Sequence, residues 1–324
     1  MNILVHLLFL HLKRNITINS EFINQININL IYKNEIEFIV DITITIIHNI
    51  DCDIDINIKS EDGGVFDMTD IIAISTNKGG VLKTTSVTNL AGVYAREGKK
   101  VLIIDTDNQG NSIMSFGKNP DKCKVTIFDI LVHGDMAEKG IINVYKNIDI
   151  IPANHDMSTF DFKILPNLTM YPNIFGLLKV AMRNIVDLYD VILIDTPPTL
   201  GLVQGNVLTF ANKVLIPFQP EGYSVKSLEK ILETIHEFKT QKNLDLEIVG
   251  VFATLVNSRT NIHKDFIDKA KKYCKKHKIK FFDTSIPQSV RFANAVAYEG
   301  TPAVIYEPYH DVSRSYFKLV KEMG

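Results

Sequence analysis

The sequence predicts an α/β domain with a mostly parallel β-sheet flanked by helices. Beyond residue 70, short uninterrupted apolar runs such as 101–104 and 191–194 alternate with longer segments of helical period. Such runs are typical of strands that are covered on both faces of a parallel sheet. The chain of 324 residues is 46% hydrophobic, which is enough apolar material for a buried core. Because a parallel sheet binds ligands at the carboxyl ends of its strands, we expect the functional residues in the loops that follow strands.

Each expected element rests on its own local pattern. Short runs rich in Ile and Val predict strands at 71–74, 101–104, 148–151, 191–194, 214–216, 248–252 and 279–282. Apolar residues at helical spacing predict helices at 85–96, about 173–187, 224–239, 261–276, 289–297 and 311–323. The order of strand, loop and helix repeats along the chain, which is typical of parallel strands joined by right-handed crossovers.

The composition excludes several classes of protein. The formal net charge is -2 and the charged fraction is 22%, which is not the composition of a disordered acidic or basic chain. The three cysteines, Cys52, Cys123 and Cys274, are too few and too far apart for a disulfide framework or a cysteine-ligated metal site. No apolar run reaches the ~18 residues of a membrane-spanning helix. These features predict a cytoplasmic protein.

Residues 1–67 differ in composition from the rest of the chain. This head holds 17 isoleucines and 9 asparagines, no alanine and no proline, and four basic against ten acidic residues. Residues with AT-rich codons dominate it. We therefore expect that it is upstream sequence translated in frame before a true start at Met68, or else a disordered segment. Its period-2 alternation, read literally, would indicate strands. The functional domain is expected at residues 68–324.

The first loop after a predicted strand contains a phosphate-binding pattern. Residues 78–85 read Lys-Gly-Gly-Val-Leu-Lys-Thr-Thr. They approximate the pattern G-x-x-x-x-G-K-[ST], in which backbone N–H groups and a helix N-terminus hold phosphates. In that pattern Lys83 would contact the β- and γ-phosphates, and the Thr84 hydroxyl would hold Mg²⁺. Asn77 and Leu82 occupy the two glycine positions, so this loop alone would also fit a simple glycine turn.

Two further loops place carboxylates at strand ends. Asp105 and Asp107 follow the apolar run 101–104, and Gln-Gly-Asn comes shortly after them. Asp195 ends the run 191–194 and precedes Thr-Pro-Pro. A single Asp after a strand is often a helix cap. Asp195, however, occupies the position of the acid that helps to hold Mg²⁺ in phosphate-loop enzymes.

Taken together, the three loops resemble those of the ParA-type partition ATPases. The shared stretches are Lys-Gly-Gly-Val-x-Lys-Thr-Thr, Asp-x-Asp-x-Gln-Gly-Asn and Asp-Thr-Pro-Pro. These ATPases belong to the deviant Walker A group, which also contains the MinD proteins and the nitrogenase iron protein. The likeness covers residues 70–323 in order and leaves out the head. It implies the fold of a phosphate-loop NTPase and, as cofactors, ATP and Mg²⁺.

The resemblance implies a role for each matching residue. Lys78 is the signature lysine, which in this family reaches across a dimer interface to the partner's nucleotide. With Lys83, which acts on the phosphates, and Asp107, which positions the attacking water, it forms the catalytic set. The Mg²⁺ site is implied at Thr84, Asp105 and Asp195. The nucleotide is expected to contact Lys78, Gly79, Gly80, Val81, Leu82, Lys83, Thr84 and Thr85, with Asn257 and Pro287 flanking the adenine. Phosphoryl transfer depends on such positioning and charge neutralisation.

One position departs from the family pattern. The family almost always has Gly where this chain has Leu82. The backbone there lies close to the β-phosphate, and a Cβ either clashes or demands an unusual φ. Two readings therefore stay open. The chain is an ATPase with a weak intrinsic rate, or it is a nucleotide-binding positioning or regulatory protein in which hydrolysis is impaired.

The resemblance also implies partners and a location. Members of the family form homodimers on ATP and bind DNA without sequence preference, which associates them with the nucleoid. A ParB-type centromere-binding protein stimulates their hydrolysis. Their task is to segregate or position a plasmid or chromosome. The DNA-binding candidates are Arg259, Arg291, Lys271 and Lys272. The two lysines lie on a lysine-rich predicted helix that would equally suit a solvated surface.

A MinD-like membrane-associated ATPase is a third reading. MinD relatives end in an amphipathic membrane helix. The corresponding end here, residues 316–324, is short, and Phe317 and Val320 can pack on the core. We therefore expect a packed terminal helix and no membrane contact. The nitrogenase iron protein is excluded because it needs paired ligand cysteines. The sequence identifies neither the cargo nor the partner.

Overall fold

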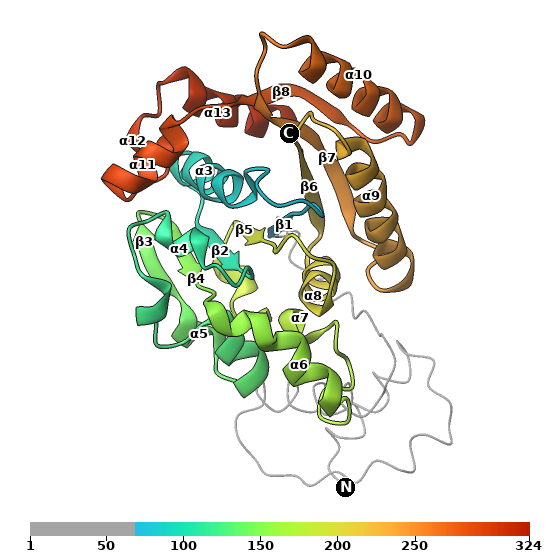
Figure 1. The fold of residues 1–324 in the computed structure, drawn as a ribbon. Helices are drawn as coiled ribbons and strands as arrows, with labels where there is room; N and C mark the ends of the chain where they lie inside the picture. Colours follow the sequence, from blue (N-terminus) through green and yellow to red (C-terminus); the bar gives the residue numbers. More distant parts are fainter. Residues whose placement is uncertain (1–68) are drawn as a thin grey trace, which may run out of the picture. The chain divides into compact units, whose positions relative to one another are not determined.

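The computed structural model describes residues 69–324, and the head lies outside the described residues. The described part contains an eight-stranded sheet of order β3-β4-β2-β5-β1-β6-β7-β8 (Figure 1). Its strands are β1 (Asp70–Ile74), β2 (Val101–Asp105), β3 (Ile142–Tyr145), β4 (Ile148–Ile151), β5 (Val191–Asp195), β6 (Lys213–Phe218), β7 (Glu247–Val256) and β8 (Phe281–Pro287). Neighbouring strands pair in parallel, except that β3 and β4 are antiparallel. The predicted fold class is confirmed.

Helices cover both faces of the sheet, so the domain has three layers (Figure 1). One face packs against α3 (Lys83–Arg96), α4 (Asn111–Met114), α11 (Arg291–Glu299), α12 (Ala303–Tyr306) and α13 (Asp311–Met323). The other face packs against α5 (Ala137–Gly140), α6 (Phe160–Ile164), α7 (Leu177–Met182), α8 (Leu202–Phe210), α9 (Ser224–Gln241) and α10 (Asn261–Lys276). Among the helices of residues 69–324, none combines the length and hydropathy that a membrane crossing requires.

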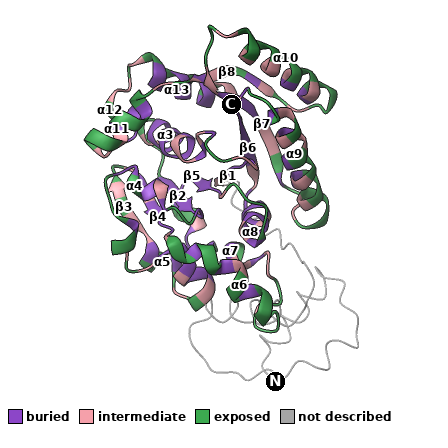
Figure 2. Ribbon diagram, in the orientation of Figure 1, coloured by how far each residue is buried: buried purple, intermediate pink, exposed green. Residues whose placement is uncertain are grey.

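Side-chain alternation along the central strands creates two cores. In β1, Ile72 and Ile74 pack toward α3 and α13, whereas Ile71 and Ala73 pack toward α8 and α9. β2 and β5 are buried along their whole length, as Figure 2 shows by the purple centre of the sheet beneath green outer helix faces. Burial on both faces explains why these strands read as continuous apolar runs.

Two expected elements differ from the structure in their bounds for reasons that the hydrogen bonds reveal. The predicted strand 279–282 is wrong at its start, because the Ile279 N–H donates to the Cys274 carbonyl at 2.9 Å and closes the end of α10. The predicted helix 173–187 shortens to α7. The Asn206 amide explains its start, since it accepts the Leu178 N–H at 3.1 Å and donates to the Ile174 carbonyl at 2.7 Å. A buried side chain more than 20 residues away thus sets this boundary, which local periodicity does not reveal.

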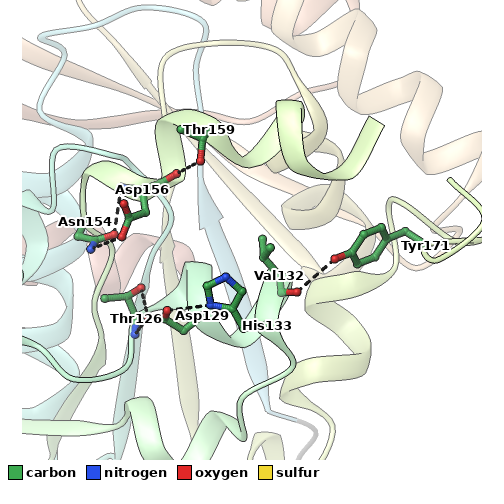
Figure 3. A network of polar contacts seen from close by, with 8 residues as sticks. All are labelled: Thr126, Asp129, Val132, His133, Asn154, Asp156, Thr159 and Tyr171. Atoms are coloured by element: carbon green, nitrogen blue, oxygen red, sulfur yellow. Dashed lines mark hydrogen bonds and ion pairs between the residues drawn. The ribbon is translucent and has the colours of Figure 1, made fainter. Parts of the chain in front are cut away.

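Local polar contacts order the segment between β2 and β5, as Figure 3 shows. Asp129 accepts hydrogen bonds from the Thr126 N–H and hydroxyl at 2.8 and 2.7 Å and contacts His133 at 3.2 Å. Burial raises the pKa of Asp129, but these hydrogen bonds outweigh it and hold the pKa below its ordinary value. The Tyr171 hydroxyl donates to the Val132 carbonyl at 3.2 Å. Each partner lies within this segment, so the network is structural.

The terminal helix α13 covers the edge strand β8. Tyr316 and Leu319 are fully buried, which confirms the predicted packed terminal helix. Both carboxylate oxygens of Glu322 accept backbone N–H groups of β8, from Asp283 at 2.7 Å and from Thr284 at 3.0 Å. A side chain therefore occupies donors that would otherwise be open on this edge of the sheet.

We predict that Glu322→Gln lowers the free energy of unfolding by about 1–2 kcal/mol at pH 7, because an amide replaces a carboxylate that accepts two backbone N–H groups. Burial raises the pKa of Glu322, but these hydrogen bonds bring it below the ordinary value. The contribution of Glu322 to the free energy of unfolding is therefore fully present above the ordinary Glu pKa. It is lost as the pH falls through the lowered pKa of the folded protein.

Denaturant unfolding of the full chain at several pH values measures this effect. Glu237→Gln is the matched control, since Glu237 is exposed on α9. Equal stabilities of the two variants at pH 7 would contradict the assignment, and so would a difference between them that persists unchanged in acid.

Candidate functional site

One edge of the sheet carries the three loops that the sequence singled out. β2, β5 and β1 lie side by side and run parallel, so their carboxyl ends meet. The phosphate loop (75–82) joins β1 to α3, residues 106–110 join β2 to α4, and residues 196–201 join β5 to α8. The phosphate loop and the loop after β5 lie close to each other. A Cβ on Gly79 would be 4.0 Å from Pro198 Cβ. Parallel register therefore assembles the candidate site.

The phosphate loop turns through two left-handed residues. Gly80 has a φ of +73° and Leu82 has a φ of +63°. Leu82 is the N-cap of α3, and its carbonyl accepts the Ser86 N–H at 2.8 Å. Val81 is buried, whereas Thr84 and Thr85 begin the helix and are half-buried. The loop thus ends on a helix N-terminus, where free N–H groups favour an anion.

Leu82 adopts the strained conformation that its Cβ was expected to demand, and that expectation is confirmed. A left-handed backbone costs a non-glycine residue roughly 1–2 kcal/mol. The Leu82 side chain is half-buried and packs against the apolar cluster that contains residues of α3 and α13. This packing offsets part of the strain, so the loop keeps a glycine-like shape without glycine.

The Lys83 ammonium is buried inside the loop. Lys83 is 7% exposed, and its Nζ donates to the Lys78 carbonyl at 2.9 Å. Burial lowers the pKa of Lys83, while the nearby charges of Asp195 and Asp107 act in the opposite direction. A bound phosphate would give this ammonium the anionic partner that its present carbonyl contact only approximates.

Lys78 points to a different loop of the same chain. Its Nζ forms an ion pair with Glu221, which lies in the loop between β6 and α9. The Gln219 side chain donates to the other Glu221 oxygen at 2.9 Å and fixes that carboxylate. Sequence reasoning missed this contact, since it spans 143 positions. The predicted role of Lys78 across a dimer would require this pair to open.

Asp195 and Asp105 lie opposite each other at the ends of adjacent strands. They are direct register partners between β5 and β2, and both are fully buried. Burial raises the pKa of Asp195 to about 6, and burial together with the Asp195 charge raises the pKa of Asp105 well above its ordinary value. Asp195 Oδ2 accepts the Ser112 hydroxyl at 3.0 Å, but its buried Oδ1 has no hydrogen-bond partner within the described chain.

Asp105 holds the loop that follows β2. Its two carboxylate oxygens accept the N–H groups of Asp107 and Ser112, both at 3.0 Å. Gly110 is required in this loop, because its φ is +63° and a Cβ would lie 2.8 Å from the Ala153 carbonyl oxygen. Asp105 therefore shapes the loop that carries Asp107, and its role as a metal ligand stays a prediction.

Asp107 faces the same site as Lys83. It is 9% exposed, and its Oδ1 accepts the Gln109 N–H at 3.0 Å. Ser112 was not among the predicted site residues, although its backbone N–H and its hydroxyl connect Asp105 to Asp195. The only available signal was its place shortly after Gln-Gly-Asn, and that did not distinguish it from an ordinary helix residue.

The orphaned oxygen of Asp195 fits a magnesium site. Residues 69–324 contain no group of three or more His, Cys, Asp or Glu side chains suited to a metal. Mg²⁺, however, usually takes only one or two carboxylates and completes its shell with phosphate oxygens and water. Asp195 Oδ1 and the Thr84 hydroxyl would supply such a partial shell. The Thr84 hydroxyl is close enough to lower the pKa of Asp195 against the effect of burial.

The predicted adenine contacts lie farther along the same edge. Asn257 directly follows β7 and Pro287 ends β8, and Val256 and Pro287 are register partners. The Asn257 side-chain oxygen accepts the Arg259 N–H at 3.1 Å, and the Asn257 backbone N–H donates to His263 Nδ1 at 3.0 Å. The structure thus places both residues on the carboxyl edge, and their contact with adenine stays a prediction.

The DNA-binding candidates differ in their surroundings. Lys271 pairs with Asp283 at 2.8 Å, and Arg291 pairs with Glu307 at 3.0 Å. Arg259 and Lys272 are exposed and form no ion pair within the described residues. Arg259 and Arg291 belong to the carboxyl edge, whereas both lysines belong to α10. The four candidates therefore do not form one compact patch.

Comparisons with known proteins agree with this geometry. The AAA domain family matches residues 69–248. Sporulation initiation inhibitor protein Soj of Bacillus subtilis is 35% identical over 258 residues, which are 79% of this chain and 99% of Soj. Among solved structures, cobyrinic acid a,c-diamide synthase of Mycobacterium smegmatis with bound ATP analog and magnesium has a TM-score of 0.68 at 26% identity, over 78% of this chain and 93% of that one. A plasmid partition protein of Borrelia burgdorferi has a TM-score of 0.59 at 25% identity, over 78% and 97%.

The fold and the loop arrangement define a phosphate-loop NTPase. Within that class, the chain belongs to the ParA family of partition ATPases, as the match to Soj over almost its whole length shows. The resemblance drawn from the three loops is thereby confirmed.

We predict that Leu82→Gly tightens binding of Mg²⁺-ATP by about five- to tenfold, or about 1 kcal/mol, because a backbone without Cβ approaches a phosphate more closely and adopts the required φ without strain. Its free energy of unfolding should change by less than about 1 kcal/mol, since relief of strain offsets lost packing. Titration calorimetry and denaturant unfolding measure the two quantities.

Leu82→Ala is the matched control for this variant. It removes the packing but keeps the Cβ and the strained φ, so it should be less stable than the natural chain and bind the nucleotide no more tightly. If Ala and Gly improved binding equally, the size of the side chain would be responsible and the argument from the backbone would be wrong.

Proposed function

We propose that this protein is a partition ATPase that dimerises on ATP, binds DNA without sequence preference and segregates or positions a plasmid or chromosome. The observation that carries the proposal is the convergence of two lysines, a helix N-terminus and two strand-end carboxylates on one edge of the sheet. This set suits a nucleoside triphosphate with its metal better than it suits any neutral ligand.

Binding of a phosphate would replace contacts within the chain by contacts with the ligand. The N–H groups of the loop and of the first turn of α3 would hold the phosphate oxygens, and the Lys83 ammonium would leave the Lys78 carbonyl for them. Thr84 and Asp195 would hold Mg²⁺, which neutralises charge on the β- and γ-oxygens when bound. The unpartnered Asp195 oxygen gains a partner in this arrangement.

Asp107 is the residue that we propose positions the attacking water. Its carboxylate lies in the loop fixed by Asp105 and faces the buried Lys83, so a water held by it would be near the terminal phosphate. Lys78 would complete the charge neutralisation from the partner protomer after release from Glu221. The rate of hydrolysis would then depend mainly on how these groups are positioned, which accords with a weak intrinsic rate.

The relatives support the cofactor and the cellular task. The synthase from M. smegmatis was solved with an ATP analog and magnesium, and the structure from B. burgdorferi is that of a plasmid partition protein. A relative in Myxococcus xanthus that is 32% identical is the chromosome partitioning protein ParA. We accordingly propose ATP and Mg²⁺ as cofactors, a ParB-type centromere-binding protein as the stimulating partner, and the nucleoid as the location.

A second candidate function follows from Leu82. Because this residue holds the phosphate loop in a strained form, a nucleotide-dependent positioning or regulatory protein with impaired hydrolysis is the alternative. A MinD-like membrane role has less support, since the apolar residues Tyr316 and Leu319 of the terminal helix are buried in the core.

We predict that the full chain forms dimers with ATP and Mg²⁺ but not with ADP, and that only the dimer retains nonspecific duplex DNA. Asp107→Ala should keep ATP-dependent dimers and DNA retention while lowering turnover by about 10²-fold or more, because a water-positioning group is lost. Lys78→Ala should lose dimers. Light scattering, DNA retention and phosphate release are the measurements.

Asp245→Ala, at an exposed position before β7, is the control and should behave as the natural chain does. Turnover that stays absent with DNA and a ParB-type protein, despite ATP-dependent dimers, would favour the regulatory alternative. Absence of ATP binding would overturn both candidate functions.

A further inference from the structure

A basic groove lies between α10 and β8, away from the nucleotide site. It has a volume of about 460 Å³ and is lined by Lys271, Lys275, Lys278, Ile279, Lys280, Phe281 and Asp283. Four lysines thus face one aspartate, and the Glu322 carboxylate lies beside that aspartate on β8. The surrounding sequence adds to this charge, because residues 269–282 contain seven lysines and no acidic residue.

The groove is at the opposite edge of the sheet from the phosphate loop. β8 runs parallel to β7, β6 and β1, so its first residue Phe281 marks the amino edge, whereas the phosphate loop follows the carboxyl end of β1. A strand of seven residues spans roughly 20 Å. Figure 1 shows α10 alongside β8, on the side of the molecule away from α11 and α12. The groove is therefore separate from the nucleotide site.

Internal partners leave much of the charge in the groove available. Lys271 pairs with Asp283 at 2.8 Å, and the Lys280 ammonium donates to the Glu322 carbonyl. Lys275 and Lys278 are exposed and have no hydrogen-bond or ion-pair partner for their ammonium groups within residues 69–324. Lysines near a helix C-terminus are favoured by the helix dipole, which accounts for Lys275. The dipole does not account for Lys278 and Lys280, which lie beyond the helix and line the same concave surface.

The side chains that line this surface favour nucleic acid over a membrane. A row of ammonium groups can follow a chain of phosphates, whereas peripheral membrane proteins usually also insert apolar side chains. No exposed large apolar side chain lines the groove, where Phe281 and Ile279 are partly covered, and the exposed Ile262 and Val290 lie at the first turn of α10 and just before α11.

We propose that the groove between α10 and β8 binds the sugar–phosphate backbone of DNA through Lys271, Lys275, Lys278 and Lys280. The proposal rests on the proposed nonspecific DNA binding and assigns its main surface to the amino edge of the sheet. DNA bound there leaves the carboxyl edge, with the nucleotide, accessible to a second protomer. Arg291, which is paired with Glu307, is a secondary contact on this assignment.

The test is DNA affinity as a function of salt for the full chain with ATP and Mg²⁺. Replacing both free lysines, as Lys275→Gln with Lys278→Gln, should weaken binding of a random-sequence duplex on the order of 10–100-fold at 0.1 M salt. It should also reduce the slope of log K against log salt by about 2, because each lost phosphate contact removes about 0.9. The matched control is Lys139→Gln with Lys146→Gln, which removes the same charge from exposed sites near the other end of the sheet.

The outcomes separate this proposal from the proposed function. If the natural chain does not bind DNA, the DNA-binding part of the proposed function fails, and this proposal fails with it. If the natural chain binds and the groove variant binds equally well with an unchanged slope, only the groove assignment is overturned. Equal losses in both double variants would indicate a general charge effect and also overturn it.

Two further measurements complete the test. Basal ATP hydrolysis should be the same in the natural chain and the groove variant, because the lysines are far from the phosphate loop, and a parallel loss of hydrolysis would overturn the assignment. Vesicles of phosphatidylcholine and phosphatidylglycerol should not compete with the duplex. If the vesicles bound through these lysines and DNA did not bind, the groove would be a membrane-binding surface and the proposal would be wrong.

Discussion

The burial of one ammonium group determines the form of the candidate site. Lys83 lies under the phosphate loop beside Asp195 and Asp107, and in the described chain it donates to the loop's own Lys78 carbonyl. A buried charge is costly unless it is paired, so this geometry favours a ligand that brings negative charge to the loop. The strand register places Asp105 beside Asp195. The site therefore also favours a cation, since a cation stabilises two neighbouring buried carboxylates.

Much of this arrangement is visible in the sequence because it depends on local patterns. Apolar runs that end in Asp105 and Asp195 reveal both the strands and the acids that follow them, and the parallel sheet explains why they meet. The side-chain pairings around the site, in contrast, are not local. Lys78 with Glu221 joins residues 143 positions apart, and Ser112 reaches Asp195 across 83. The half-exposed edge strand β3 and helix α8 also escaped prediction, because their short segments carry weak periodic signals.

Leu82 shows how a departure from a family pattern is accommodated. The backbone keeps the left-handed turn that a glycine would adopt freely, and the side chain enters the apolar cluster beneath α3. The geometry of the loop is thus maintained by packing instead of by intrinsic conformational preference. Favourable packing and backbone strain therefore oppose each other at one residue, as is common where a backbone conformation is imposed by its surroundings.

The contact between Glu322 and β8 has a consequence for how copies of the molecule can associate. Sheets of neighbouring molecules merge only where a strand offers free backbone donors, and here a carboxylate from the last helix occupies two of them. Growth by strand addition is thereby blocked at this border. Any assembly that leaves the carboxylate in place must therefore use surfaces other than this border of the sheet.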